Sequence, residues 1–200
     1  MNLLILYPKL FNVQSKFDRK LKRIIANNVV DSITFVHDDC GLLSTYVLDN
    51  EMSVELKQTS DIDYAGITHA ILFDDSEEFH AERVSLKVSK IPYRIISIKL
   101  TRVVNINREP QYKANKSTST YEYIGRGSYW GNPYSMFEDG DDRDEVIRKY
   151  RYDFDYEKFP HIDKQEVFKL HGKRLGCFCK PDTCHGDVLA DFLNSWDDGN

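Results

Sequence analysis

Three of the four cysteines in this 200-residue chain lie within nine positions, together with a histidine. They are Cys177, Cys179, Cys184 and His185. The first two are two positions apart in a predicted strand over 174–179, so their side chains share a face. The other two lie where a helix over 186–196 is expected to begin. The first N–H groups of a helix are unpaired and its dipole favours negative charge, so this junction is suited to a site.

The residue types of this cluster allow three kinds of chemistry. Thiolate and imidazole ligands at this density suit zinc, with four ligands in a closed site or three ligands plus water. The adjacent Cys184 and His185 would need an unusual turn to bind one ion. In a second reading Cys184 or Cys179 is a nucleophile activated by the helix N-terminus, with His185 as acid or base. In a third, the cysteines are inert and only pack.

A loop rich in glycine precedes this cluster in the second half of the chain, at 125–133. Its glycines allow close approach of the backbone, and Asn132-Pro133 forms turns readily. An arginine in such a loop is a natural anchor for an anion because of its planar fork. We therefore expect Arg126 and the backbone from Gly125 through Gly131 to Asn132 to bind an anionic group such as a phosphate. The alternative is a turn whose aromatic residues fill the core.

The loop and the cluster together form the pattern G-R-x4-G-N-P followed by C-x-C-x4-C-H. Over residues 121–193 this pattern closely resembles a family of unknown function found largely in bacteriophage and related microbial genomes. The resemblance implies a phage origin, hence a host-cytoplasm setting, and no settled activity. Its signature positions fall on Gly125, Arg126, Gly131, Asn132, Pro133, Cys177, Cys179, Cys184 and His185.

The composition fits a soluble globular protein of one large or two small domains, with 41% hydrophobic and 30% charged residues. No apolar run approaches the roughly 20 residues that a membrane span requires. The apolar start of the chain is read as a strand, because it lacks a basic region and a cleavage site. Clustered cysteines favour a metal or reactive site in a reducing compartment, and therefore a cytoplasmic protein.

The first half of the chain alternates predicted strands with predicted helices. The strands are expected at 3–6, 33–36, 53–56, 68–73 and 93–98, the last continuing as far as 106, and the helices at 17–25, 42–50 and 79–89. This alternation predicts an α/β fold, with a Rossmann-like parallel sheet over residues 1–109. Ligands bind at the carboxyl ends of such strands, which carry His37–Cys40 and Asp74–Ser76.

This order of elements, with D-x4-G-x2-H-A-I-L-F-D-D-S at 61–76, resembles the nucleotide-binding domains of the SLOG/YpsA-like superfamily over residues 2–100. The resemblance implies a glycine-rich phosphate loop after the second strand. Here that position holds His37-Asp38-Asp39-Cys40-Gly41, whose acidic residues repel a phosphate. We therefore expect this fold for the first half of the chain, whether or not it binds a nucleotide. The alternative to a nucleotide-binding domain is a scaffold domain with no ligand of its own.

The second half is expected to be a small α/β domain over 121–200, separated from the first by a linker at 110–120 rich in serine and threonine. Helices are predicted at 141–156 and 164–170, the first of them with acidic residues capping its N-terminus. Asn27-Asn28 is predicted to end the first helix of the chain, and residues 197–200 are predicted to fray.

Charge is unevenly distributed in a chain of net charge −5. The stretch Lys87–Lys116 carries eight basic residues and one acid, whereas 138–145 is almost entirely acidic. Both are typical of solvated surface, but the basic stretch with Tyr93, Tyr112 and Tyr121 could contact nucleic acid. The acidic stretch could instead meet a basic partner.

Two functions follow as hypotheses. The first is an enzyme acting on a nucleotide, nucleoside or modified base, of hydrolase or glycosyl-transfer type, which predicts a pocket containing Arg126 and an unligated cysteine or histidine. The second is a zinc-stabilised module that binds a host protein or nucleic acid, which predicts four closed ligands and no pocket. The sequence specifies neither the substrate nor the oligomeric state.

Overall fold

The computed structural model describes residues 1–26, 28–113, 117–136 and 140–199, which form two compact units. The first unit comprises Met1–Ile98 together with the residues from Ser195 on, and the second comprises Lys99–Asn194. Among the described residues, every helix is too short or too polar to span a bilayer. The elements of the first unit are β1 (Asn2–Leu6), α1 (Gln14–Ile25), β2 (Ser32–Phe35), α2 (Leu42–Asp49), β3 (Glu55–Gln58), a 3-10 turn η1 (Tyr64–Gly66), β4 (His69–Asp74), α3 (His80–Val88) and β5 (Tyr93–Ser97).

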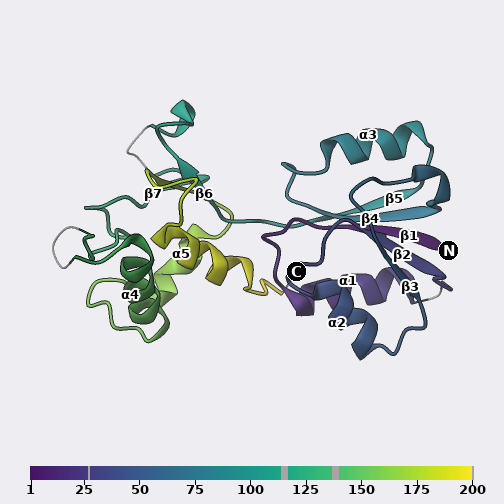
Figure 1. Ribbon diagram of the computed structural model, residues 1–200, viewed down its shortest axis with the longest axis horizontal. Coiled ribbons are helices and arrows are strands. Elements are labelled where there is room, and N and C mark those ends of the chain that lie inside the picture. Colours follow the sequence, from purple (N-terminus) through teal and green to yellow (C-terminus); the bar gives the residue numbers. More distant parts are fainter. Residues whose placement is uncertain (27, 114–116, 137–139, 200) are drawn as a thin grey trace. The chain divides into compact units, whose positions relative to one another are not determined.

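The first unit is built on a five-stranded parallel sheet of order β3-β2-β1-β4-β5. Helices α1 and α2 cover one face of this sheet and α3 covers the other (Figure 1). The central strand β1 is buried from Leu3 to Leu6, as expected for an apolar run with helices on both faces. The predicted Rossmann-like α/β fold is therefore confirmed for this unit.

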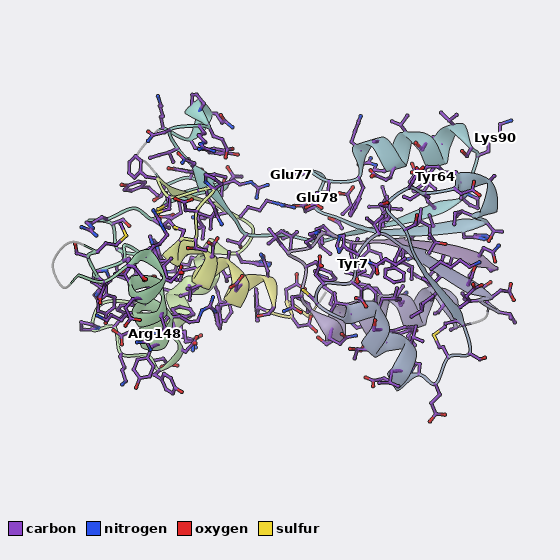
Figure 2. The ribbon with its side chains drawn as sticks, in the orientation of Figure 1. Tyr7, Tyr64, Glu77, Glu78, Lys90 and Arg148 are labelled. Carbon is purple, nitrogen blue, oxygen red and sulfur yellow. The ribbon has the colours of Figure 1, made fainter. Side chains whose placement is uncertain are left out.

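Helix α1 docks on the sheet through apolar residues at helical spacing. Phe17, Leu21 and Ile25 are four positions apart and all buried. Tyr7, which follows β1 and is labelled in Figure 2, meets the ring of Phe17 edge-on at a centroid distance of 5.3 Å. Each buried aromatic or aliphatic side chain of this kind contributes roughly 1.5–3 kcal/mol, so this face holds α1 beside the end of β1.

The second unit has its own three-stranded parallel sheet of order β6-β8-β7. Leu175, in the middle of the central strand, is fully buried. Its core also takes buried residues from the last two helices, such as Tyr150 and Leu189. The elements are β6 (Arg102–Asn105), η2 (Pro110–Tyr112), β7 (Tyr121–Tyr123), α4 (Arg143–Asp155), η3 (Lys164–Leu170), β8 (Arg174–Cys177) and α5 (His185–Asn194).

The predicted boundary between the domains was wrong. Residues 99–109 belong to the second unit, because β6 pairs with β8 in the register Val103↔Leu175. The predicted linker at 110–120 also lies inside this unit, where the rings of Tyr112 and Tyr121 stack at 5.4 Å. Within the described part of this segment Tyr112 is therefore packed and the other residues are exposed, whereas residues 114–116 lie outside the described residues.

Several smaller predictions need correction. The strand predicted from 93 towards 106 is two strands in two sheets, β5 and β6, and the strand predicted at 53–56 lies at Glu55–Gln58. The predicted helix at 164–170 is a 3-10 helix, and β8 ends at Cys177. Capping of α4 is confirmed, since Asp142 accepts a hydrogen bond from the Glu145 N–H at 2.8 Å. Asn27, Glu138 and Asp139 lie outside the described residues.

Candidate functional site

The glycine-rich loop and the Cys/His cluster lie side by side because they follow neighbouring strands. Strands β7 and β8 pair in parallel, with Tyr123 opposite Gly176, so their carboxyl ends meet at one edge. The pairing continues one residue further, where the Ile124 N–H donates to the Gly176 carbonyl at 2.9 Å. The loop at 125–133 and the segment at 177–185 therefore leave the sheet from the same edge, where α/β sheets bind ligands.

Glycine at 131 lets the loop fold back on itself. A Cβ atom added at Gly131 would lie 2.9 Å from the Gly125 carbonyl oxygen and 3.3 Å from the Arg126 Cα. Its N–H donates to the Ser128 carbonyl at 3.1 Å, closing the turn. Gly131 is not among the described residues that line the pocket below, so the structure gives it a role in shaping the loop.

A pocket of about 160 Å³ opens between the loop and the cluster. Of the residues proposed from sequence, all but Gly131 line it. Side chains from the second half of the unit, among them Phe178 and Thr183, complete the wall. The proposed site residues that line it are Gly125, Arg126, Asn132, Cys177, Cys179, Cys184 and His185.

The two polar loop residues have different parts in this pocket. Asn132 uses both polar atoms on the backbone: Oδ1 accepts from the Tyr134 N–H at 2.9 Å, and Nδ2 donates to the Val146 carbonyl at 3.3 Å. It therefore fixes the turn. Arg126 is exposed and donates from Nη2 to the Tyr134 carbonyl at 3.3 Å. Five N–H donors on its guanidinium leave it able to bind an anion as well.

Arg143 is a second pocket arginine that sequence reasoning missed. It starts α4, donates to the Thr183 carbonyl at 3.3 Å and pairs with Asp182 at 3.3 Å. The acidic run around it was interpreted only as helix capping. The signal that could have found it is its charge, because it is the one basic residue within 138–145.

The Cys/His cluster of Cys177, Cys179, Cys184 and His185, which we also call the Cys/His corner, has the donors and spacing of a metal site. Donor atoms of Cys177, Cys184 and His185 lie within 4.8 Å of one another, and all three residues are buried. Cys184 Sγ is 3.7 Å from His185 Nδ1, and Cys177 Sγ is 3.5 Å from Cys179 Sγ. Thiolate and imidazole ligands at about 2.3 and 2.0 Å from one zinc are roughly 3.5–3.8 Å apart. The cluster could therefore bind a metal, and the adjacency of Cys184 and His185 is no obstacle.

The imidazole of His185 is oriented for ligation. Its Nε2 lies 2.8 Å from the Ile124 carbonyl oxygen. A carbonyl only accepts, so Nε2 carries the hydrogen and the lone pair of Nδ1 faces Cys184. Burial lowers the pKa of His185, which keeps the ring neutral. Histidines that bind a metal through one ring nitrogen typically donate a hydrogen bond from the N–H of the other nitrogen, often to a backbone carbonyl.

Negative charge in the cluster concentrates on the half-buried Cys179. Hydrogen bonds from the thiols of Cys177 and Cys184, and then the nearby Arg143, lower the pKa of Cys179 far below its usual value. The bond to Cys179 raises the pKa of Cys177, and the bonds to Cys177 and Cys179 raise the pKa of Cys184. The cluster thus presents a thiolate next to an arginine on the pocket wall.

In the first unit, the carboxylate of Asp38 occupies the N-terminus of α2 at the carboxyl end of the parallel strands. Asp38, after β2, accepts from the N–H groups of Leu43 and Ser44 at 3.0 and 2.9 Å, and from the Tyr7 hydroxyl. Partial burial alone would raise the pKa of Asp38, but hydrogen bonds from Ser44 and Tyr7 outweigh it and lower that pKa. The first-turn donors of α2 are therefore used internally, and a phosphate there would have to displace Asp38.

Comparison with known proteins follows this division of the fold. Residues 1–104 match the family described as "Minimal SLOG domain". The chain belongs to this family. Residues 104–195 match a second family, "Domain of unknown function (DUF4326)". The SLOG match thus ends in β6, close to where the structure divides the chain and before the linker predicted at 110–120.

The chain is also similar to an uncharacterized 12.4 kDa protein in the nrdA-td intergenic region of Enterobacteria phage T4. The two are 37% identical over 97 residues, which cover 48% of this chain and 80% of that protein. No solved structure matches the chain. Both resemblances inferred from sequence are confirmed: the SLOG superfamily for the first half, and a family of unknown function for the second.

Proposed function

We propose that the pocket of the second unit binds a nucleotide, nucleoside or modified base, and that the protein acts on it as an enzyme of hydrolase or glycosyl-transfer type. One observation carries the proposal: Arg126, Arg143 and the Cys/His corner line the same pocket. The SLOG family membership of the first unit adds support for a nucleotide-related role. A pocket containing Arg126 is also what the enzyme hypothesis requires and what a closed binding module lacks.

The two arginines are suited to one anionic group of the substrate. Arg143 is paired with Asp182, whose side chain is 62% exposed, and exposed pairs of this kind contribute about 0–1 kcal/mol. The guanidinium can therefore exchange this partner for a ligand at little cost. Together Arg126 and Arg143 would neutralise the two charges of a phosphate monoester, each through a planar fork.

The corner would supply the reactive group. Cys177, Cys184 and His185 would hold zinc, with Cys179 either as a fourth ligand or as a thiolate facing the substrate. Bound zinc would polarise an oxygen of the substrate or activate water. In either arrangement Arg126 and Arg143 would orient the substrate, and the apolar side chains of Phe178 and Ile147 would contact one side of it.

The second candidate is a zinc-stabilised binding module for a host protein or nucleic acid. Its support is that Cys177 and Cys184 belong to the hydrophobic core of the unit, where a metal would add to stability. The basic stretch Lys87–Lys116 supports it less, because it is divided between the two units and Tyr121 is buried. The relative from phage T4 favours a phage origin for this chain, with the host cytoplasm as its setting.

Calorimetric titration with nucleoside monophosphates tests the proposal. We expect Arg126→Gln and Arg143→Gln each to lower the affinity at least tenfold, because each removes a charge-assisted hydrogen bond. Arg148→Gln is the matched control: this residue lies on the same helix as Arg143, is exposed, pairs with Glu145 and is not among the residues lining the pocket (Figure 2).

Chromatography of the same mixtures separates the two candidates. A released base or phosphate that disappears with Arg126→Gln supports the enzyme, whereas binding without any product supports the module. Absence of binding by the unmodified protein, or an equal loss in the Arg148→Gln control, contradicts the proposed site.

A further inference from the structure

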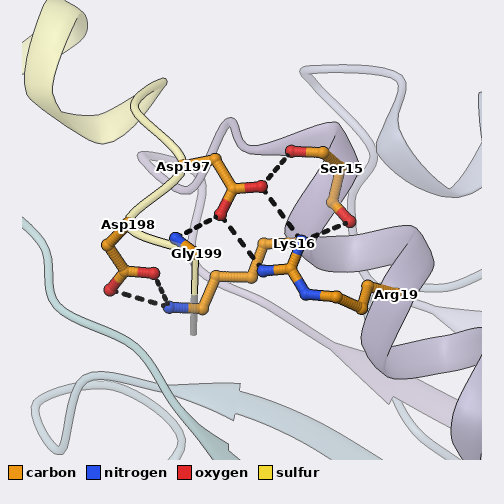
Figure 3. Close-up of polar contacts among 6 residues, drawn as sticks. All are labelled: Ser15, Lys16, Arg19, Asp197, Asp198 and Gly199. Carbon is orange, nitrogen blue, oxygen red and sulfur yellow. Dashed lines mark hydrogen bonds and ion pairs between the residues drawn. The ribbon is translucent and has the colours of Figure 1, made fainter.

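Residues 197–199 bind the beginning of helix α1 in the first unit (Figure 3). The prediction that this segment frays was wrong for these residues, since they make specific polar contacts. Asn200 lies outside the described residues. The segment also follows the last residue of the second family match, 195, so neither family accounts for it.

Two consecutive carboxylates make these contacts. Asp197 forms a two-pronged pair with Arg19, at 3.0 and 3.1 Å, and accepts from the Ser15 hydroxyl at 2.5 Å. Both oxygens of Asp198 contact the ammonium of Lys16, at 2.9 and 3.1 Å. The three partners all lie in the first two turns of α1, so the segment is bound as an anion is bound by a basic site.

Lys16 is a buried cation that is paired with an anion at this place on α1. It is only 7% exposed, and within the described ranges the Asp198 carboxylate is its sole ion-pair or hydrogen-bond partner. A buried ammonium without a partner is strongly unfavourable. If Asp198 left, the ammonium would either be hydrated or bind another anion in the same position.

The topology places this basic site where α/β sheets bind ligands. In the order β3-β2-β1-β4-β5, the chain runs from β1 through β2 to β3 on one side and then crosses to β4 on the other side of β1, so the switch point is at the carboxyl end of β1. Helix α1 begins there. Unlike α2, whose first turn is capped by Asp38, α1 begins after Val13 with no side-chain cap.

We propose that Asp197 and Asp198 act as an internal ligand of a basic site formed by Ser15, Lys16 and Arg19. The site takes a small phosphate-bearing anion when the acidic segment leaves it, so that segment and anion exclude each other. The donors fit this exchange: an ammonium, a guanidinium fork and a hydroxyl bind phosphate oxygens as they bind carboxylate oxygens. The segment is thus autoinhibitory for the first unit.

Titration with pyrophosphate tests this exclusion. All proteins carry Arg126→Gln and Arg143→Gln, so that the pocket of the second unit does not contribute. We expect the Asp197→Asn/Asp198→Asn variant to bind pyrophosphate at least tenfold more tightly than the parent. Adding Lys16→Met to that variant should abolish the gain. Equal affinity of the parent and the double variant, or a gain that survives Lys16→Met, overturns the proposal.

A second measurement covers the case in which the double variant does not fold. In the parent protein the Gly199 N–H donates to Asp197 at 2.9 Å, and its amide resonance reports on the bound segment. We expect saturating pyrophosphate to shift this resonance, together with that of Lys16, as the segment is displaced. An unchanged Gly199 resonance at saturating pyrophosphate overturns the proposal.

Discussion

Replacing Gly131 by alanine should displace the loop that carries Arg126. The added Cβ would lie 2.9 Å from the Gly125 carbonyl oxygen, 3.2 Å from that of Ser128 and 3.3 Å from the Arg126 Cα. All three neighbours are backbone atoms, which cannot rotate away as a side chain can. The contact is therefore relieved only by moving the loop by several tenths of an ångström, and the Arg126 guanidinium moves with it.

The expected size of the effect follows from the packing. Overpacking of this kind costs about 1–3 kcal/mol. With a slope of about 2 kcal/mol per molar urea, the unfolding midpoint should fall by about 0.5–1.5 M. Calorimetric titration of Gly131→Ala should also show a loss of affinity for nucleoside monophosphates, because Arg126 no longer reaches the anion in its original position.

Gly127→Ala is the matched control in the same loop. Gly127 has φ +83° and nothing within 4 Å of an added Cβ. Its replacement therefore costs roughly 1 kcal/mol through backbone strain but meets no neighbour. We expect reduced stability with nearly unchanged affinity. The reasoning is refuted if Gly131→Ala unfolds and binds like the parent protein, or if Gly127→Ala loses as much affinity.

Three further predictions concern other residues. Asp38→Ala should destabilise the first unit by about 0.5–2 kcal/mol at pH 7. The folded pKa of Asp38 lies below its unfolded value, so this stabilisation is present above about pH 4 and is lost as the pH falls below it; urea unfolding at pH 7 and pH 3 should show the difference shrinking. The hydrogen bond to Asp153 raises the pKa of Tyr134 to about 12, so ultraviolet titration of Tyr134→Phe should show one tyrosinate fewer in the late part of the curve, to which buried tyrosines such as Tyr150 also contribute. Leu175→Ala should lower the free energy of unfolding, measured in urea, by about 2–5 kcal/mol, because the leucine side chain is fully buried.

The elements of the first unit were predictable because their signals are local. The run from Leu3 to Leu6 is apolar without interruption, and Phe17, Leu21 and Ile25 repeat at helical spacing. The domain boundary was not predictable in this way. Strand β6 is defined by its pairing with β8, about seventy residues further along, and the polar composition after Pro110 resembled a linker.

The candidate site was predictable to a similar extent. Cysteine and histidine spacing identified the corner, and neighbouring strands explain why Arg126 lies next to it. The contribution of Arg143 depends on where α4 begins relative to β8, which spacing does not reveal. The contacts of Asp38 and Asp198 were likewise not predictable from local sequence. Each carboxylate binds donors from another element of the fold, Asp38 those of α2 and Asp198 those of α1.

A crystal structure with a bound nucleoside monophosphate tests the central claim most directly. The account predicts the phosphate within hydrogen-bonding distance of both Arg126 and Arg143, with metal density between Cys177, Cys184 and His185. A nucleotide bound away from this pocket, or a phosphate that contacts neither arginine, would contradict the account.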